Sequence, residues 1–153
     1  MLYLVIWKLA TGNVSKVSCY DINMNANRLE RLVEFRHTLR GFLFFSEEAA
    51  AEEGIHAQQY QLMQVVFAAT EPTIAYVAER MYLRHNSAVE LVGRAVEEGL
   101  LLRKRDLIDA RRVVLKLTPR GERILMRLVD RHLLELDRVG PQIKLALEKV
   151  MSK

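Results

Sequence analysis

The sequence contains only one cysteine, three prolines and seven glycines in 153 residues. With Cys19 alone, an intrachain disulfide framework is excluded and a reducing compartment is favoured, so we expect a cytoplasmic protein. Cys19 is expected to be an ordinary thiol, and a redox sensor is the alternative. No apolar run is long enough to span a bilayer, and there is no internal repeat or low-complexity linker. These absences favour one globular domain without a membrane partner.

The residue patterns of enzymes and metal proteins are also missing. No nucleophile, base and orienting group occur together in a motif, and there is no glycine-rich phosphate loop. The histidines fall at no ligand spacing with one another or with Cys19; they are His37, His56, His85 and His132. We therefore expect a protein that is not an enzyme and that holds no cofactor and no metal.

Basic residues are present in excess, and the excess is local. The formal net charge is +4, and half of the residues are hydrophobic, which is enough to bury one core. Between Arg103 and Arg112 there are five basic side chains against Asp106 and Asp109. This concentration of positive charge favours an anionic partner at that stretch.

The first 27 residues are treated as an N-terminal extension of uncertain structure. Met1 to Ala10 is a short apolar run that fits a strand or a frayed helix, and a polar stretch follows it. A secretory signal is an alternative, although no basic leader and no clear cleavage site border the run. Translation from Met24 is another alternative that the residues leave open.

Apolar spacing predicts three helices before residue 82. The first runs from Arg28 to Glu53 and is closed by Gly54, the second runs from Gln58 to Ala69, and Thr73 caps a short third one. The first helix carries more aromatic residues than one packing face needs, namely Phe35, Phe44 and Phe45. Such an excess often marks a subunit interface or a ligand pocket.

The stretch from Leu83 to Thr118 predicts a helix followed by a two-stranded wing. One helical face is apolar and consists of Ala88, Leu91, Val92, Ala95 and Val96. Gly99 supplies a left-handed residue that ends this helix. Strands at Leu100–Arg105 and Val113–Thr118 then flank the polar run Asp106–Arg112, as in a hairpin.

A further helix is predicted to start at Thr118-Pro119, with threonine as the cap and proline at the first helical position. Its apolar stripe continues to Arg138, where Gly140-Pro141 is expected to break the chain before a terminal helix at residues 143–150. These end helices have little of their own to pack against. We therefore expect them, with the long first helix, to form a symmetric homodimer.

The residues from Thr73 to Leu125 resemble the MarR family (multiple antibiotic resistance regulators) of bacterial transcription factors. The resemblance is carried by four blocks in the same order and spacing: Ala78-Glu79-Arg80, Leu91–Leu101, Asp109-Ala110-Arg111-Arg112, and Leu117-Thr118-Pro119-Arg120-Gly121. It extends over about Arg28 to Val150. It implies a mainly α fold with a small β-hairpin wing, which is a winged helix-turn-helix that dimerises through its N- and C-terminal helices.

The resemblance also implies a domain plan and a function. Residues 28–57 and 119–153 would be the dimerisation helices, and residues 58–118 the DNA-binding lobe. The expected function is a sequence-specific regulator of transcription, a repressor that leaves a pseudo-palindromic operator when a small effector binds. The chain departs from the family at Gly93, where an acidic residue is usual, and at Leu107-Ile108 in the wing tip.

Double-stranded DNA is the expected partner, because the N-terminal half of a helix in the major groove reads base edges. The residues expected at that position are Arg84, His85, Asn86, Ser87 and Glu90, with Arg94 beyond them. In the wing, Arg103, Lys104 and Arg105 are expected at phosphates, and Arg112 is also expected to contact DNA. Arg111 is expected in the minor groove, held by Asp109, as the resemblance implies.

Plainer interpretations stay open beside these. Glu90 and Arg94 also fit a solvated helix pair, and the wing cations also fit a charged sheet edge. Phe42, His56 and Tyr60 are expected to line a pocket for an aromatic or amphipathic effector, although core packing explains Phe42 and Tyr60 equally well. A winged-helix module for protein contact, without DNA binding, is the alternative function.

Overall fold

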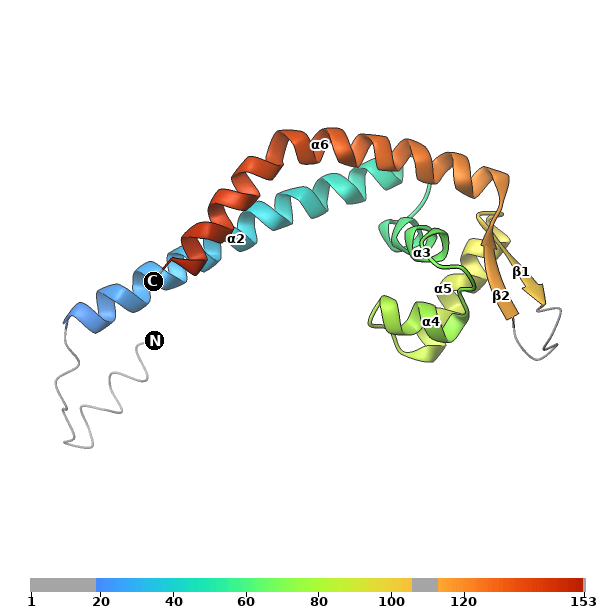
Figure 1. Ribbon diagram of the computed structural model, residues 1–153, viewed down its shortest axis with the longest axis horizontal. Helices are drawn as coiled ribbons and strands as arrows, with labels where there is room; N and C mark the ends of the chain where they lie inside the picture. Colours follow the sequence, from blue (N-terminus) through green and yellow to red (C-terminus); the bar gives the residue numbers. More distant parts are fainter. Residues whose placement is uncertain (1–18, 106–112, 153) are drawn as a thin grey trace, which may run out of the picture. The chain divides into compact units, whose positions relative to one another are not determined.

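The computed structural model describes residues 19–105 and 113–152, with side chains from residue 26 onward. These residues form helices and one antiparallel hairpin (Figure 1). The elements are α2 (Cys19–Glu52), α3 (Ala57–Phe67), α4 (Ile74–Arg80), α5 (His85–Glu97), β1 (Leu101–Arg105), β2 (Val113–Leu117) and α6 (Pro119–Met151). The expected class, mainly α with a small β hairpin, is confirmed.

The described residues divide into two compact units, one within residues 41–140 and the other formed by residues 19–40 with 141–152. The larger unit holds the main hydrophobic core. Its largest fully buried apolar side chains come from α3, α5, the hairpin and α6, and are Leu62, Met63, Leu91, Leu100, Leu101, Leu115, Leu125 and Leu128. Burial of these side chains fixes the helix-turn-helix against the hairpin.

Three helices of the larger unit end in the same backbone motif. The motif places one residue in the left-handed region just after the helix, and the amides of this residue and of its successor bond back to carbonyls of the last turn. Gly54 (φ 73°) follows α2, Tyr82 (φ 54°) follows α4, and Gly99 (φ 68°) follows α5. Both glycine stops agree with the sequence prediction.

The base of the hairpin is joined to the start of α6. The Thr118 hydroxyl accepts a hydrogen bond from the Gly121 amide (3.0 Å) and donates to the Gly99 carbonyl (2.6 Å). The Thr118 amide donates to the Leu100 carbonyl at 3.0 Å. Thr118 is therefore the predicted helix cap, and it also ties α6 to the end of α5.

The smaller unit brings the first part of α2 against the last part of α6. The Arg31 guanidinium donates to the carbonyl of Lys149 (3.1 Å), and to the carbonyl (3.0 Å) and hydroxyl (2.8 Å) of Ser152. Carbonyls at a helix C-terminus lack intrahelical donors. Arg31 supplies these donors from the other helix.

Two predicted boundaries are wrong. Helix α2 begins at Cys19 rather than at Arg28, so it includes a polar stretch in which we saw no apolar period. The Gly140-Pro141 pair does not end the helix: α6 continues through it to Met151. Proline removes one backbone donor, but the other hydrogen bonds of this 33-residue helix keep the helical path.

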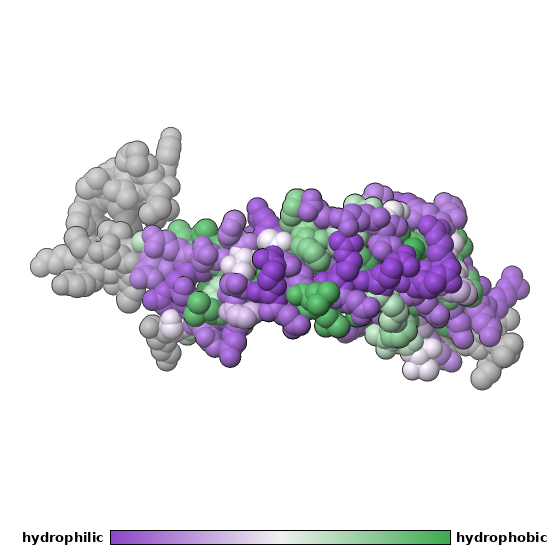
Figure 2. Space-filling view, turned by 90° about the horizontal axis from the view of Figure 1, so that it is seen from above, coloured by the Kyte–Doolittle hydropathy of each residue, from purple (hydrophilic) through white to green (hydrophobic). Residues whose placement is uncertain are grey.

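Both long helices carry exposed apolar side chains. On α2 these are Leu29, Leu32, Val33, Leu43 and Phe44, and on α6 they are Met126, Leu133, Leu134, Leu136, Leu145, Leu147 and Met151. Figure 2 shows hydrophobic patches interrupting a hydrophilic surface on one face. In the described part of the chain, no helix combines the length and the hydropathy that crossing a bilayer requires.

Candidate nucleic-acid interface

Helix α5 buries one face and exposes the other, as its sequence period predicted. Ala88, Leu91, Val92 and Ala95 are buried in the core, and Val96 packs against it. The six residues predicted to meet DNA, Arg84, His85, Asn86, Ser87, Glu90 and Arg94, are all exposed. The structure thus brings these six side chains together on the outer face and first turn of one helix.

The N-terminus of α5 offers unpaired amides. Arg84 is the residue before the helix, its backbone is extended, and no described side chain caps the first turn. The first helical hydrogen bond runs from the Ala88 amide to the Arg84 carbonyl, at 3.0 Å. The amides of the three residues between them have no intrahelical acceptor, and no acidic residue occupies this turn. Such a terminus attracts an anion.

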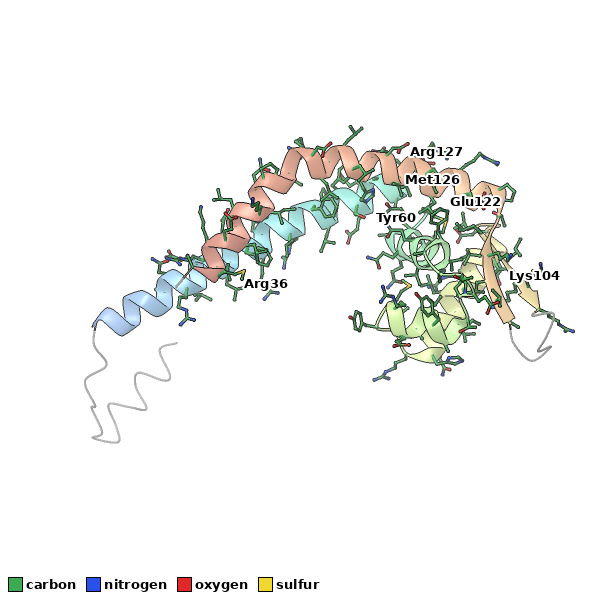
Figure 3. All side chains as sticks on the ribbon, in the orientation of Figure 1. Arg36, Tyr60, Lys104, Glu122, Met126 and Arg127 are labelled. Carbon is green, nitrogen blue, oxygen red and sulfur yellow. The ribbon has the colours of Figure 1, made fainter. Side chains whose placement is uncertain are left out.

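The hairpin places cations beside this helix. Its register pairs Arg103 with Leu115 and Arg105 with Val113, so the two arginines share one face and Lys104 lies on the other. All three are exposed and pair with no described acid; Figure 3 labels Lys104 on the hairpin. The predicted contacts Asp109, Arg111 and Arg112 lie outside the described residues.

Hydrogen bonds hold the hairpin and the helices of this lobe together. The Leu115 amide of β2 donates to the Pro72 carbonyl, just before α4, at 2.8 Å. Arg120, near the start of α6, donates to the Glu98 carbonyl at the end of α5. The hairpin is therefore fixed to the segment that precedes α4, and α6 is fixed to the end of α5.

A cavity of about 590 Å³ lies behind the exposed face of α5. It is lined by Glu47, Ala51, Ile55, His56, Ala57, Gln58, Gln59, Leu91 and Arg94. Of the predicted pocket residues only His56 is among them. Arg94 thus borders the cavity and also belongs to the helix predicted to meet DNA.

Gln59 gives the cavity an unusual polar group. Its side chain is 1% exposed, and its carbonyl oxygen accepts a hydrogen bond from the His56 amide at 2.8 Å. Its amide nitrogen is buried and has no acceptor within hydrogen-bonding distance among the described residues. A buried unpaired donor is costly, so Gln59 marks a position where a ligand acceptor would be favourable.

Phe42 and Tyr60 belong to a different cluster, centred on His132. The ring centroids of Phe42, Phe45 and Tyr60 lie 5.9, 5.5 and 4.6 Å from that of His132. His132 Nδ1 is 2.6 Å from the Leu128 carbonyl, and Nε2 is 2.9 Å from the Ser46 hydroxyl. Burial raises the pKa of the Tyr60 phenol, which keeps it neutral. Figure 3 labels Tyr60 on α3.

Sequence reasoning missed several of these residues. Glu47, Gln59 and His132 are far apart in the chain and fit helical surface or core patterns one by one. Only their placement in space joins them to a cavity or a ring cluster. Among the described residues, no group of three or more histidine, cysteine or acidic side chains could hold a metal ion.

Helix α4, a turn, the exposed helix α5 and a basic hairpin define a winged helix-turn-helix protein. No protein-family model matches the sequence, and no curated protein matches it. Solved structures do match.

A MarR family protein from Bacillus stearothermophilus is 24% identical, with a TM-score of 0.66 over 76% of this chain and 80% of that one. Staphylococcus aureus MarR, in complex with salicylate and kanamycin, is 20% identical, with a TM-score of 0.64 over 79% and 80%. An E. coli MarR mutant complexed with operator DNA is 20% identical, with a TM-score of 0.61 over 81% and 94%. The chain has the winged-helix fold of the MarR family proteins.

Proposed function

We propose that this protein is a sequence-specific DNA-binding regulator of transcription, and that it acts as a repressor released by a small molecule. The observation that carries the proposal is the first turn of α5. Its amides are unpaired, and its side chains Arg84, Asn86 and Ser87 are exposed beside a basic hairpin. Free amides and arginine bind phosphate, while arginine and asparagine recognise guanine and adenine in the major groove.

The fold supports the same proposal. A MarR protein with this fold was solved with operator DNA. In such a complex α5 enters the major groove, and Arg103 and Arg105 contact the phosphates flanking it. Arg111, outside the described residues, is proposed at the minor groove with Asp109 beside it.

DNase footprinting on the DNA upstream of the protein's own gene tests the proposal, followed by affinity measurements across a salt series. Affinity is expected to fall steeply with salt, and Arg103→Ala to lower the slope of log affinity against log salt by about 1. Asn86→Ala is expected to relax the choice at one base pair and to weaken cognate binding by about 1 to 3 kcal/mol.

Lys144→Ala is the matched control, since it removes one exposed positive charge on the last part of α6. It should leave affinity and slope unchanged. A wild-type protein that binds every duplex weakly, with no protected site, would instead favour the protein-contact module.

The active form is proposed to be a homodimer. The exposed apolar side chains of α2 and α6 would be buried against a second copy, and Leu134, at 72% exposed, is a prominent one. Paired recognition helices about 34 Å apart then enter successive major grooves. Analytical ultracentrifugation should find a dimer, and Leu134→Glu should shift it toward monomer. A wild-type chain that stays monomeric at micromolar concentration would refute this part of the proposal.

The cavity beside α5 is proposed as the effector site. Its lining combines two donors, the Arg94 guanidinium and the Gln59 amide, with the Glu47 carboxylate, and Ile55 and Leu91 supply an apolar wall. We expect a ligand whose anionic or carbonyl group contacts the two donors and lies away from Glu47. A ligand that holds Arg94 and binds the free protein more tightly than the DNA-bound protein would weaken DNA binding by the ratio of the two ligand affinities.

Salicylate is a suitable probe, because a structure of this fold was solved with it. Salicylate should weaken operator binding by the wild type, and Gln59→Leu should reduce this effect. Unchanged inhibition of the Gln59→Leu and Arg94→Ala variants would place the effector elsewhere.

A further inference from the structure

The residue that ends α4 differs in kind from those that end α2 and α5. In each case a residue in the left-handed region donates to the carbonyl three positions back, and its successor donates five positions back. The bonds are Gly54–Ala51 (2.9 Å) and Ile55–Ala50 (3.1 Å), Tyr82–Glu79 (3.2 Å) and Leu83–Ala78 (2.8 Å), and Gly99–Val96 (3.0 Å) and Leu100–Ala95 (2.9 Å). Two of the motifs use glycine, and the third uses a tyrosine.

Tyr82 is unfavourable for folding at this position. Glycine adopts positive φ freely, whereas a side chain there brings Cβ too close to the following carbonyl. A bulky residue could offset this by burial, but Tyr82 is 98% exposed. Neither packing nor backbone geometry explains the tyrosine, and an unfavourable residue kept in an exposed turn suggests a role outside the folded chain itself.

The position of Tyr82 indicates that role. It lies in the turn between the two helices of the helix-turn-helix, two residues before Arg84, which precedes α5. When α5 enters a major groove, the preceding helix crosses the DNA backbone, so this turn faces the phosphates that border the groove. Arg84 and His85, which follow this turn at the start of α5, are also exposed.

We infer that Tyr82 is a DNA-backbone contact: its phenol donates a hydrogen bond to a phosphate oxygen beside the groove that α5 reads. This inference rests on the proposed function. Tyrosine is among the side chains that bind phosphate through a neutral donor. The left-handed backbone directs the phenol outward from the turn, where no described residue covers it.

Two variants separate the contact from the strain. Tyr82→Phe keeps the backbone conformation and removes only the hydroxyl, whereas Tyr82→Gly removes the side chain and relieves the strain. Both are measured by fluorescence anisotropy on a duplex of roughly 30 bp that carries the footprinted site. A scrambled duplex and a salt series accompany them, and thermal unfolding reports on the fold.

Tyr82→Phe is expected to bind about tenfold more weakly to both duplexes, since a phosphate contact carries no base information. Its salt slope should match the wild type, because a neutral donor releases no counterion. Tyr82→Gly should bind at least as weakly as Tyr82→Phe, yet its Tm should rise by roughly 2 to 8 °C. A fall in affinity together with a rise in stability is a result that a structural role cannot give.

If Tyr82→Phe binds DNA as tightly as the wild type, or if the Tm of Tyr82→Gly is no higher than that of the wild type, the inference is overturned and the proposed function stands. If the wild-type protein shows no salt-dependent binding to DNA, both the inference about Tyr82 and the proposed function are overturned.

Discussion

Replacing Gly121 with alanine tests how closely α6 packs on the hairpin. A Cβ at Gly121 would lie 2.2 Å from the carbonyl oxygen of Leu100 and 3.1 Å from its carbonyl carbon. Both atoms belong to the backbone, so no side chain can rotate away. Because contacts under 3.0 Å essentially never occur, helix and hairpin must separate by about 0.8 Å.

The size of the effect follows from what this movement disturbs. Overpacking of this kind costs about 1 to 3 kcal/mol. Loss of the hydrogen bond from the Thr118 amide to the Leu100 carbonyl adds about 1 kcal/mol. The better helix propensity of alanine offsets about 1 kcal/mol. Gly121→Ala should therefore destabilise the protein by about 1 to 3 kcal/mol, which lowers Tm by roughly 2 to 12 °C.

Thermal and urea unfolding measure the difference, and Gly93→Ala is the matched control. Gly93 lies inside α5, where an added Cβ meets no described atom within 4 Å. Alanine there should leave stability unchanged or raise it by about 0.5 to 1 kcal/mol. If Gly121→Ala proved as stable as Gly93→Ala, the close approach of α6 to the Leu100 carbonyl would be refuted.

Three other changes test separate parts of the fold. Thr118→Ala should cost about 1 to 2 kcal/mol in urea unfolding, with Thr118→Ser close to wild type, because the hydroxyl makes two hydrogen bonds at the base of the hairpin. The Arg127 guanidinium, bonded at 2.5 Å, holds the pKa of the Glu53 carboxyl below its usual value. The ion pair between Glu53 and Arg127 therefore stabilises the folded protein at neutral pH, and this contribution is lost as the pH falls through the lowered pKa of Glu53. Glu53→Gln should have a lower Tm than the wild type at neutral pH and the same Tm in strong acid. A Tm difference of equal size at the two pH values would show that the charge of Glu53 is not the cause. Because α6 is continuous at Pro141, Pro141→Ala should raise Tm. It should also increase the free energy of unfolding measured in urea by up to about 3 kcal/mol.

Helix ends that carry a capping residue were predicted correctly from the sequence. Thr73, Gly99 and Thr118 act through local backbone chemistry: the two threonines cap the starts of α4 and α6, and Gly99 ends α5, as expected. Pro141 misled the prediction because its effect depends on how strongly the helix around it is held. The start of α2 was missed because its first residues lack an apolar period.

The outer face of α5 was predictable because a helical period of about 3.6 residues fixes which side chains share a face. The cavity was not, since Glu47, Gln59 and Arg94 come from three separate helices. Tyr82 was missed for another reason: no residue pattern marks a positive φ when the residue is not glycine or asparagine. Its backbone hydrogen bonds reveal the conformation.

The end helices, which were predicted to have little to pack against in one chain, carry exposed apolar side chains. Helix α6 starts at the base of the hairpin, at Thr118, and in the same unit carries Leu133 and Leu134, which are exposed. One continuous helix therefore links the hairpin to the surface proposed for dimerisation. Since a packed helix moves as a rigid element, a change in how two copies pair would be transmitted directly to the hairpin cations. This coupling would need no further device, because α6 belongs both to the surface proposed for dimerisation and to the base of the hairpin.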